Sequence, residues 1–206
     1  MYRIVAISGG TGEPSNSTKL AERILVATST ELGGLGAQVE TEVIALRPLA
    51  HDLVDMALTG IASDALQAAF DSIRTAHGVV VVASVYNASP FGLFQLFLQL
   101  FPDGGLDGIP VTLGATGGTA RHSLVVESHI RPLVSYLKGL ALPTTVFAAT
   151  DDWGAPESVT GLNARVHRAA TELARFVTSV PDETRNVFDD LDPEGVTPFD
   201  QLLGGL

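Results

Sequence analysis

The sequence GVVVVASVYNASPFGLFQLFLQLF, from Gly78 to Phe101, decides how this chain folds. Its first part, residues 79–85, is an unbroken run rich in β-branched residues, which is typical of a strand buried on both faces of a parallel sheet. The segment then turns through residues 86–90 and, after Gly92, becomes a helix-length apolar stretch. This order predicts an α/β fold in which the strand is central and the turn after it is a ligand site.

The predicted helix from Gly92 to Phe101 is apolar on nearly all sides. Gln95 and Gln99 are its polar residues, and they lie one turn apart on a single stripe. A helix on the surface of a monomer has a wide polar face, so this helix carries more apolar surface than one sheet can cover. We therefore predict that it forms a subunit interface in a homo-oligomer, either a dimer or a tetramer.

Length and composition exclude several classes of protein. The chain has 206 residues, no cysteine and a formal net charge of −11, so thiol catalysis and Cys-ligated zinc are excluded and nucleic-acid binding is disfavoured. No apolar run reaches membrane-spanning length, and the N-terminus enters a strand without the pattern of a signal peptide. We expect a soluble, cytoplasmic protein with one domain over residues 1–180.

Residues 181–206 form an acidic C-terminal tail. The tail carries seven acidic residues against Arg185, and it ends in apolar residues around Phe199 and Leu206. Such a segment is disordered, covers a neighbouring subunit or docks a partner protein. We expect it to cover a subunit of the same oligomer.

Strand and helix patterns alternate along the rest of the chain. We predict strands at residues 3–8, 39–46, 109–114 and 144–150 in addition to the central one, with 39–46 at an edge, and helices at 18–32, 65–76, 124–138 and 159–177. Pro132 is expected to kink or interrupt its helix. The pattern predicts a doubly wound parallel sheet, with the loops after the first, third and fourth strands on one edge.

The loop after the first strand is rich in glycine and hydroxyl side chains. It runs GGTGEPSNST from Gly9 to Thr18 and leads directly into a helix. Inward-pointing backbone N–H groups and the hydroxyls of Ser15, Ser17 and Thr18 at a helix N-terminus are suited to a phosphate. The alternative is an ordinary N-capped helix after a flexible turn.

The loop after the fourth strand, ATGGTARHS from Ala115 to Ser123, also contains glycines and also precedes a helix. Arg121 and His122 within it are either exposed residues at a helix N-terminus or groups that face the ligand. Elsewhere, His51 and His77 stand alone, and Asp151 with Asp152 lacks a third ligand, so we predict no metal site. No triad or dyad indicates acid–base or nucleophilic catalysis.

Taken together, EPSNST, VYNASPFG and ATGGTARH with the following RPLVSYLK make the chain similar to the flavodoxin-like NAD(P)H-dependent FMN reductases. It most resembles the branch that supplies reduced FMN to luciferase-like two-component monooxygenases. The resemblance covers the first strand to about residue 150. It implies a flavodoxin-like five-stranded sheet in the order 2-1-3-4-5, with helices on both faces.

The resemblance also implies roles for individual residues. Ser15, Ser17 and Thr18 would bind the FMN phosphate, Tyr86 and Asn87 would line the isoalloxazine ring, and Thr116, Gly117 and Gly118 would contact its pyrimidine end. Gly10, Val85, Ala88, Arg121 and His122 complete the expected cofactor site. The family often has Arg where this chain has Gly12, and Arg121 is the substitute that we expect to contact the nicotinamide nucleotide, NADPH or NADH.

The implied reaction is hydride transfer from the nicotinamide to flavin N5, in which the protein mainly positions the two rings. No residue is required as a general acid or base, although Arg121 or His122 would help to stabilise developing negative charge. Two alternatives stay open on the same fold. One is a quinone or azo reductase that retains FMN, and the other is a flavodoxin-like electron carrier without a nicotinamide site.

Overall fold

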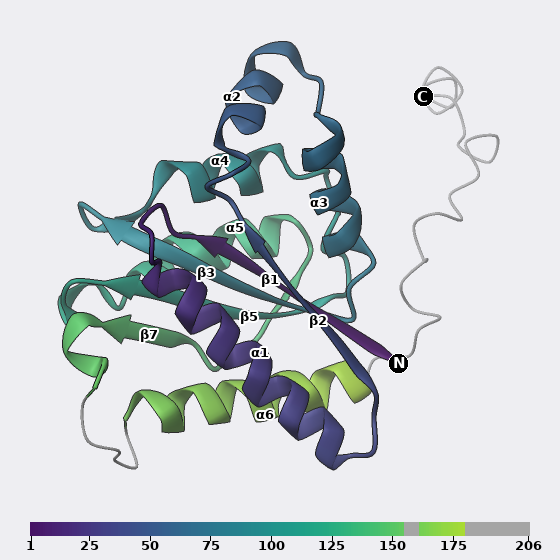
Figure 1. Ribbon diagram of the computed structural model, residues 1–206, viewed down its shortest axis with the longest axis vertical. Helices are drawn as coiled ribbons and strands as arrows, with labels where there is room; N and C mark the ends of the chain where they lie inside the picture. Colours follow the sequence, from purple (N-terminus) through teal and green to yellow (C-terminus); the bar gives the residue numbers. More distant parts are fainter. Residues whose placement is uncertain (155–160, 180–206) are drawn as a thin grey trace, which may run out of the picture.

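The computed structural model describes residues 1–154 and 161–179. A parallel sheet lies between two layers of helices (Figure 1). The predicted tail, residues 181–206, and the first residues of the last predicted helix lie outside the described residues. The strands are β1 (Tyr2–Gly9), β2 (Val39–Ala45), β3 (Gly78–Tyr86), β4 (Ser89–Pro90), β5 (Pro110–Gly117), β6 (Leu140–Ala141) and β7 (Val146–Ala149).

The α-helices connect these strands across both faces of the sheet. They are α1 (Asn16–Gly34), α2 (Ala50–Thr59), α3 (Asp64–Arg74), α4 (Gly92–Leu100), α5 (Arg131–Tyr136) and α6 (Leu162–Ser179). Helices α1 and α6 cover one face, and α2, α3, α4 and α5 cover the other (Figure 1). This arrangement confirms the predicted doubly wound α/β fold of the flavodoxin type.

The strand order is β2-β1-β3-β5, and both β6 and β7 pair with β5. The predicted order 2-1-3-4-5 is therefore confirmed, with two short strands sharing the fifth position. Pro143, which has no N–H group, separates them, and the N–H of Thr144 donates to the Glu172 carboxylate at 2.8 Å instead of to β5. The two-residue strand β4 is an antiparallel addition to β3 that the sequence did not predict.

The central strand β3 is buried on both faces, as predicted. Residues from Val79 to Ala83 have no exposed surface. Val79 and Val81 belong to the core under α2 to α5, whereas Val80 and Val82 belong to the core under α1 and α6. Alternating side chains of one strand thus join both hydrophobic cores, which fixes β3 in the middle of the sheet.

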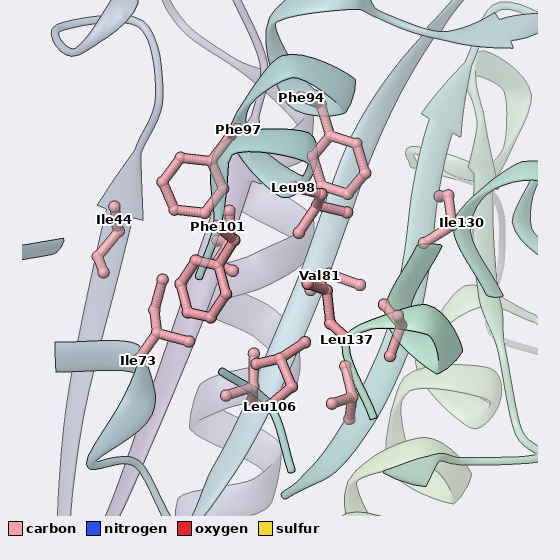
Figure 2. Packing of buried hydrophobic residues seen from close by; sticks show 14 of the residues in the cluster. Ile44, Ile73, Val81, Phe94, Phe97, Leu98, Phe101, Leu106, Ile130 and Leu137 are labelled. Carbon is pink, nitrogen blue, oxygen red and sulfur yellow. The ribbon is translucent and has the colours of Figure 1, made fainter. Parts of the chain in front are cut away.

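Helix α4 is covered more completely within the chain than its sequence suggests. Phe94, Phe97 and Leu98 are buried, and Figure 2 shows their side chains directed toward the sheet and the neighbouring helix. The Phe70 ring of α3 lies 5.4 Å from the ring of Phe97. Three leucines of α4 are half-buried and follow one stripe of the helix: Leu93, Leu96 and Leu100. These three leucines are the part of α4 that a second subunit could contact. The subunit interface stays a prediction.

The helix predicted for residues 124–138 is present as continuous helical backbone from residue 125 to residue 136. A 3₁₀ turn (Ala120–His122) precedes it, and a π-helical turn (Val126–Ile130) leads directly into α5. Pro132 directly follows the π-helical turn, a local irregularity of the kind that accommodates a proline inside a helix. The expected interruption at Pro132 is confirmed, and it takes the form of this π-helical turn.

Candidate functional site

Three loops meet at the carboxyl edge of the sheet, after β1, β3 and β5. Their strands end at the same level because Ser8 pairs with Val82 and Val82 pairs with Gly114 in parallel register. The loops enclose a cavity of about 310 Å³, which is within the range of small-molecule sites. Its lining residues are Gly12, Pro14, Ser15, Asn16, Ser17, Ser84, Val85, Tyr86, Thr116, Gly117, Gly118 and Thr150.

The cavity gathers seven of the thirteen residues that the sequence analysis proposed for cofactor binding. Those in the lining are Ser15, Ser17, Val85, Tyr86, Thr116, Gly117 and Gly118. Six others lie outside it: Gly10 and Thr18 line a neighbouring cavity, Asn87 and Ala88 form the β3–β4 turn, and Arg121 and His122 lie in the 3₁₀ turn after β5.

Five lining residues were not among the predicted ones: Gly12, Pro14 and Asn16 of the first loop, together with Ser84 and Thr150. Ser84 stands inside a strand, where a side chain is expected to pack and not to contact a ligand. Thr150 directly follows β7, whose carboxyl end lies on the same sheet edge as the other loops. Because ligands bind at the carboxyl ends of parallel strands, the position of Thr150 after a predicted strand could have identified it from the sequence.

Two unpaired backbone N–H groups lie at the N-terminus of α1, on residues that line the cavity. Ser15 is the N-cap, and its hydroxyl accepts a hydrogen bond from the Thr18 N–H at 3.1 Å. Within the described residues, the backbone N–H groups of Asn16 and Ser17 have no hydrogen-bond partner. Both residues line the cavity. Free N–H groups at the positive end of a 19-residue helix are suited to an anion such as a phosphate.

A hydroxyl cluster of Ser17, Ser84 and Thr116 lines the cavity, with Ser17 and Thr116 buried and Ser84 half-buried. The Ser17 hydroxyl bonds to Ser84 Oγ at 2.9 Å and to Thr116 Oγ1 at 2.8 Å. Ser17 is 1% exposed and Thr116 is 7% exposed. The cluster therefore ties α1, β3 and β5 together. The Ser17 hydroxyl is engaged with protein groups, whereas its backbone N–H is free for a ligand.

Thr18 and Gly10 support the loop from the side away from this cavity. The Thr18 hydroxyl bonds to Ser8 Oγ of β1 at 2.8 Å. A Cβ atom at Gly10 would lie 2.0 Å from the Ser15 hydroxyl, so only glycine allows the capping side chain to sit there. These two predicted ligands hold the shape of the phosphate loop.

Tyr86, the last residue of β3, lines the cavity and leads into a tight turn. Asn87 and Ala88 have φ angles of 48° and 62°, the left-handed pair required by a two-residue hairpin. The Tyr86 ring lies 5.0 Å from the Phe91 ring, and its hydroxyl lies 3.4 Å from Thr11 Oγ1 of the first loop. The ring is 49% exposed and presents a face to the solvent side of the site.

The lining of this cavity contains no charged side chain among the described residues. The shifted pKa values occur elsewhere: hydrogen bonds from Ser72 and Arg3 lower the pKa of Glu42, and Arg131 lowers the pKa of Glu127. Over residues 1–154 and 161–179, no group of three His, Asp or Glu side chains is placed to hold a metal ion. Within the same residues, no helix is long and apolar enough to cross a membrane.

The family model of the NADPH-dependent FMN reductases matches residues 2–154. The chain belongs to this family. Like its other members, this reductase is an oxidoreductase that uses FMN and a reduced nicotinamide nucleotide. The matched residues include all three loops that surround the cavity.

Two relatives of the reductase differ in the nucleotide that they are named for. It is 35% identical to the FMN reductase (NADPH) of Pseudomonas aeruginosa, over 84% of this chain and 91% of that protein. It is 33% identical to the NADH-dependent FMN reductase SfnE of Pseudomonas putida, over 81% and 88%. Among solved structures, an oxidoreductase from Corynebacterium diphtheriae has a TM-score of 0.84 at 35% identity, covering 88% of this chain and 99% of that one.

The residues at the sheet edge fit FMN. The free N–H groups of Asn16 and Ser17 suit its phosphate, and the exposed ring of Tyr86 suits the flat faces of aromatic rings. A Cβ atom added at Gly118 would meet nothing within 4 Å, so open space remains beside the third loop. The cavity lining thus offers both backbone hydrogen-bond donors and aromatic surface to a ligand.

Proposed function

We propose that the reductase binds FMN in this cavity, with the phosphate on the backbone N–H groups of Asn16 and Ser17. The ring would lie between the Tyr86 hairpin and the loop that contains Thr116, Gly117 and Gly118. The observation that carries the proposal is the pair of free N–H groups at the start of α1, directly beside the hydroxyl cluster. Asn87 and Ala88 would offer backbone donors from the strained turn.

The protein's part in the reaction is positioning. When bound, FMN supplies a ring nitrogen that accepts hydride from the nicotinamide. Tyr86 and Val85 hold one side of the ring site, and the loop after β5 holds the other. Arg121 and His122 are the last two residues of the 3₁₀ turn after that loop, and we propose that they supply positive charge at the open side of the ring site.

We further propose that the reductase releases reduced FMN to a partner flavin-dependent monooxygenase. The support is the neutral lining of the cavity: the phosphate would be held by hydrogen bonds from N–H groups, and no lysine or arginine is among the described lining residues. Hydrogen bonds without a paired cation favour modest affinity and exchange with solvent. A quinone or azo reductase that keeps its flavin would need slower exchange.

One experiment tests this function. The purified protein is mixed anaerobically with FMN and either NADPH or NADH, the loss of flavin absorbance is followed, and the mixture is then passed through an ultrafiltration membrane. Flavin reduction with reduced FMN in the filtrate is the expected result. Reduced flavin retained with the protein would favour the quinone or azo reductase. No reduction by either nucleotide would favour the electron carrier and contradict the proposal.

The predicted homo-oligomer is also part of the proposal. Helix α4 packs beside α2 (Figure 1), in which Val54 is 49% and Leu58 79% exposed; Ile61, just after α2, is 73% exposed. Exposed apolar side chains near the half-buried leucines of α4 favour contact with a second subunit. Changing Leu96 and Leu58 to Glu should lower the mass measured by light scattering. An unchanged mass would contradict an interface at α4.

We assign the flavin-binding unit to residues 1–180 and treat residues 181–206 as a separate acidic tail that covers a neighbouring subunit. Removing the tail after Val180 should leave FMN binding intact and weaken assembly. If mass and thermal stability did not change, the tail would have no role in assembly. We also propose a cytoplasmic location, where reduced nicotinamide nucleotides are supplied.

A further inference from the structure

A second cavity lies on the other side of the phosphate loop, toward the edge of the sheet. It has a volume of about 610 Å³ and extends from the N-terminal turns of α1 to the end of β2. We call it the β2 cavity. Its lining is Gly10, Gly12, Glu13, Pro14, Ser15, Thr18, Lys19, Glu22, Ala45, Arg47 and Pro48. None of the functions described above uses this space.

The backbone fixes Arg47 at the mouth of the β2 cavity. The Leu46 N–H donates to the Ser8 carbonyl at 3.0 Å, which holds the end of β2 against the end of β1. Arg47 follows immediately, and its Nη1 lies 3.0 Å from Glu13 Oε2 of the phosphate loop. This pair is exposed, with 52% of the Arg47 side chain and 83% of the Glu13 side chain in contact with solvent. A competing anion can therefore replace Glu13 at little cost.

The rest of the lining divides into a charged part and an apolar part. Lys19 on α1 is exposed and has no ion pair within the described residues, and Glu22 lies one turn further along the same helix. Pro14, Ala45 and Pro48 present apolar surface. The combination of a guanidinium, an ammonium and flat apolar surface suits a phosphorylated nucleoside, since arginine binds phosphate oxygens bidentately.

We propose that the β2 cavity binds the adenosine end of the nicotinamide nucleotide, with the 2′-phosphate of NADPH on Arg47 and Lys19. The phosphate takes the place of the Glu13 carboxylate, and the adenine lies against the prolines. This inference rests on the proposed function, because it concerns the reductant of the same site. It makes Arg47 the residue that discriminates NADPH from NADH, which lacks the 2′-phosphate.

Two features of the structure support a single dinucleotide that reaches both cavities. Gly12, Pro14 and Ser15 line the FMN cavity as well as the β2 cavity, so the two spaces meet at one loop. The end of the second strand of a parallel sheet, beside the loop of the first, is also where other nucleotide-binding α/β sheets read the adenosine 2′ position. One relative is named for NADPH and another for NADH, so membership of the family does not decide which nucleotide is preferred. The preference of this chain for NADPH or NADH then depends on its own residues.

Binding of nucleotide fragments tests the inference without any flavin. Calorimetry compares 2′,5′-ADP with 5′-AMP, which differ by the 2′-phosphate alone. The unmodified protein should bind 2′,5′-ADP more tightly, and Arg47→Ala should weaken it by about tenfold to a hundredfold while AMP is unaffected. Arg47→Lys should recover part of the loss. Arg175→Ala, an exposed arginine on α6 outside the cavity, is the matched control and should change neither affinity.

Glu13→Gln gives the opposite change. Removing the competing carboxylate should strengthen 2′,5′-ADP binding by about twofold to fivefold. In steady-state assays with FMN, Arg47→Ala should lower kcat/KM for NADPH and leave that for NADH unchanged. The inference would be overturned if the unmodified protein bound 2′,5′-ADP and AMP equally. It would also be overturned if Arg47→Ala kept the same preference for NADPH over NADH. FMN titration separates a failure of this inference from a failure of the proposed function. Arg47→Ala should bind FMN as tightly as the unmodified protein does, whether or not the β2 cavity binds a nucleotide.

Discussion

Ser17 offers a direct test of how the site is built. Its hydroxyl bonds to Ser84 and Thr116, and its backbone N–H has no hydrogen-bond partner within the described residues. Ser17→Ala removes the hydroxyl from the cluster and keeps the N–H. The two partner hydroxyls then lose a buried partner, which costs about 1–3 kcal/mol of unfolding free energy. FMN affinity should change by less than about threefold, since the phosphate contact is a backbone group.

The assays are urea denaturation followed by circular dichroism and FMN titration followed by flavin fluorescence. Ser29→Ala is a matched control in the same helix, because the Ser29 hydroxyl has no hydrogen-bond partner among the described residues. It should leave FMN binding unchanged and alter stability by no more than about 0.5 kcal/mol. A double-mutant cycle with Thr116→Val should give a coupling energy of about 0.5–3 kcal/mol between the two positions.

The opposite pattern would refute this reasoning. If Ser17→Ala left the unfolding free energy unchanged and raised the FMN dissociation constant by about tenfold or more, the hydroxyl would bind the phosphate directly. The residue would then be a ligand, as its sequence position suggests, and the hydroxyl cluster would have no stabilising role.

Three other predictions concern backbone strain, packing and pH. Ala88→Gly should raise the unfolding free energy by about 0.5–1 kcal/mol in thermal denaturation, because Ala88 has a φ of 62°, and no gain would count against strain in the turn. Gly9→Ala should lower it by about 1–3 kcal/mol, since the new Cβ would lie 2.7 Å from Phe94 Cβ; an unchanged melting temperature would show that α4 can shift freely. Hydrogen bonds from Ser72 and Arg3 lower the folded-state pKa of Glu42, so its stabilisation is present above the ordinary glutamate pKa of about 4.3 and is lost as pH falls through the lower folded value. Denaturation at a series of pH values should show that the unfolding free energy of Glu42→Gln falls less steeply at acid pH than that of the unmodified protein. An identical fall in both proteins would show that Glu42 does not contribute to the acid dependence of stability.

The sequence by itself determined the arrangement of the sheet. An uninterrupted run such as residues 79–85 has to be buried on both faces, because no side of it is polar, and the alternation of strand and helix patterns leaves parallel pairing as the solution. The carboxyl-edge rule then predicts that the three loops lie together. It correctly brought Ser15, Tyr86 and Thr116 into one cavity.

Only the tertiary structure decided what individual groups do within that arrangement. Hydrogen-bond direction depends on neighbours that are far apart in the sequence: the Ser17 hydroxyl meets Thr116, 99 positions later. The coverage of α4 depends on Phe70 and other side chains of a separate helix, and the position of Arg47 depends on how β2 pairs with β1. Local patterns specify which segments are buried and in what order they pair. The orientation of a hydroxyl or a guanidinium is set by packing between segments, which no local pattern contains.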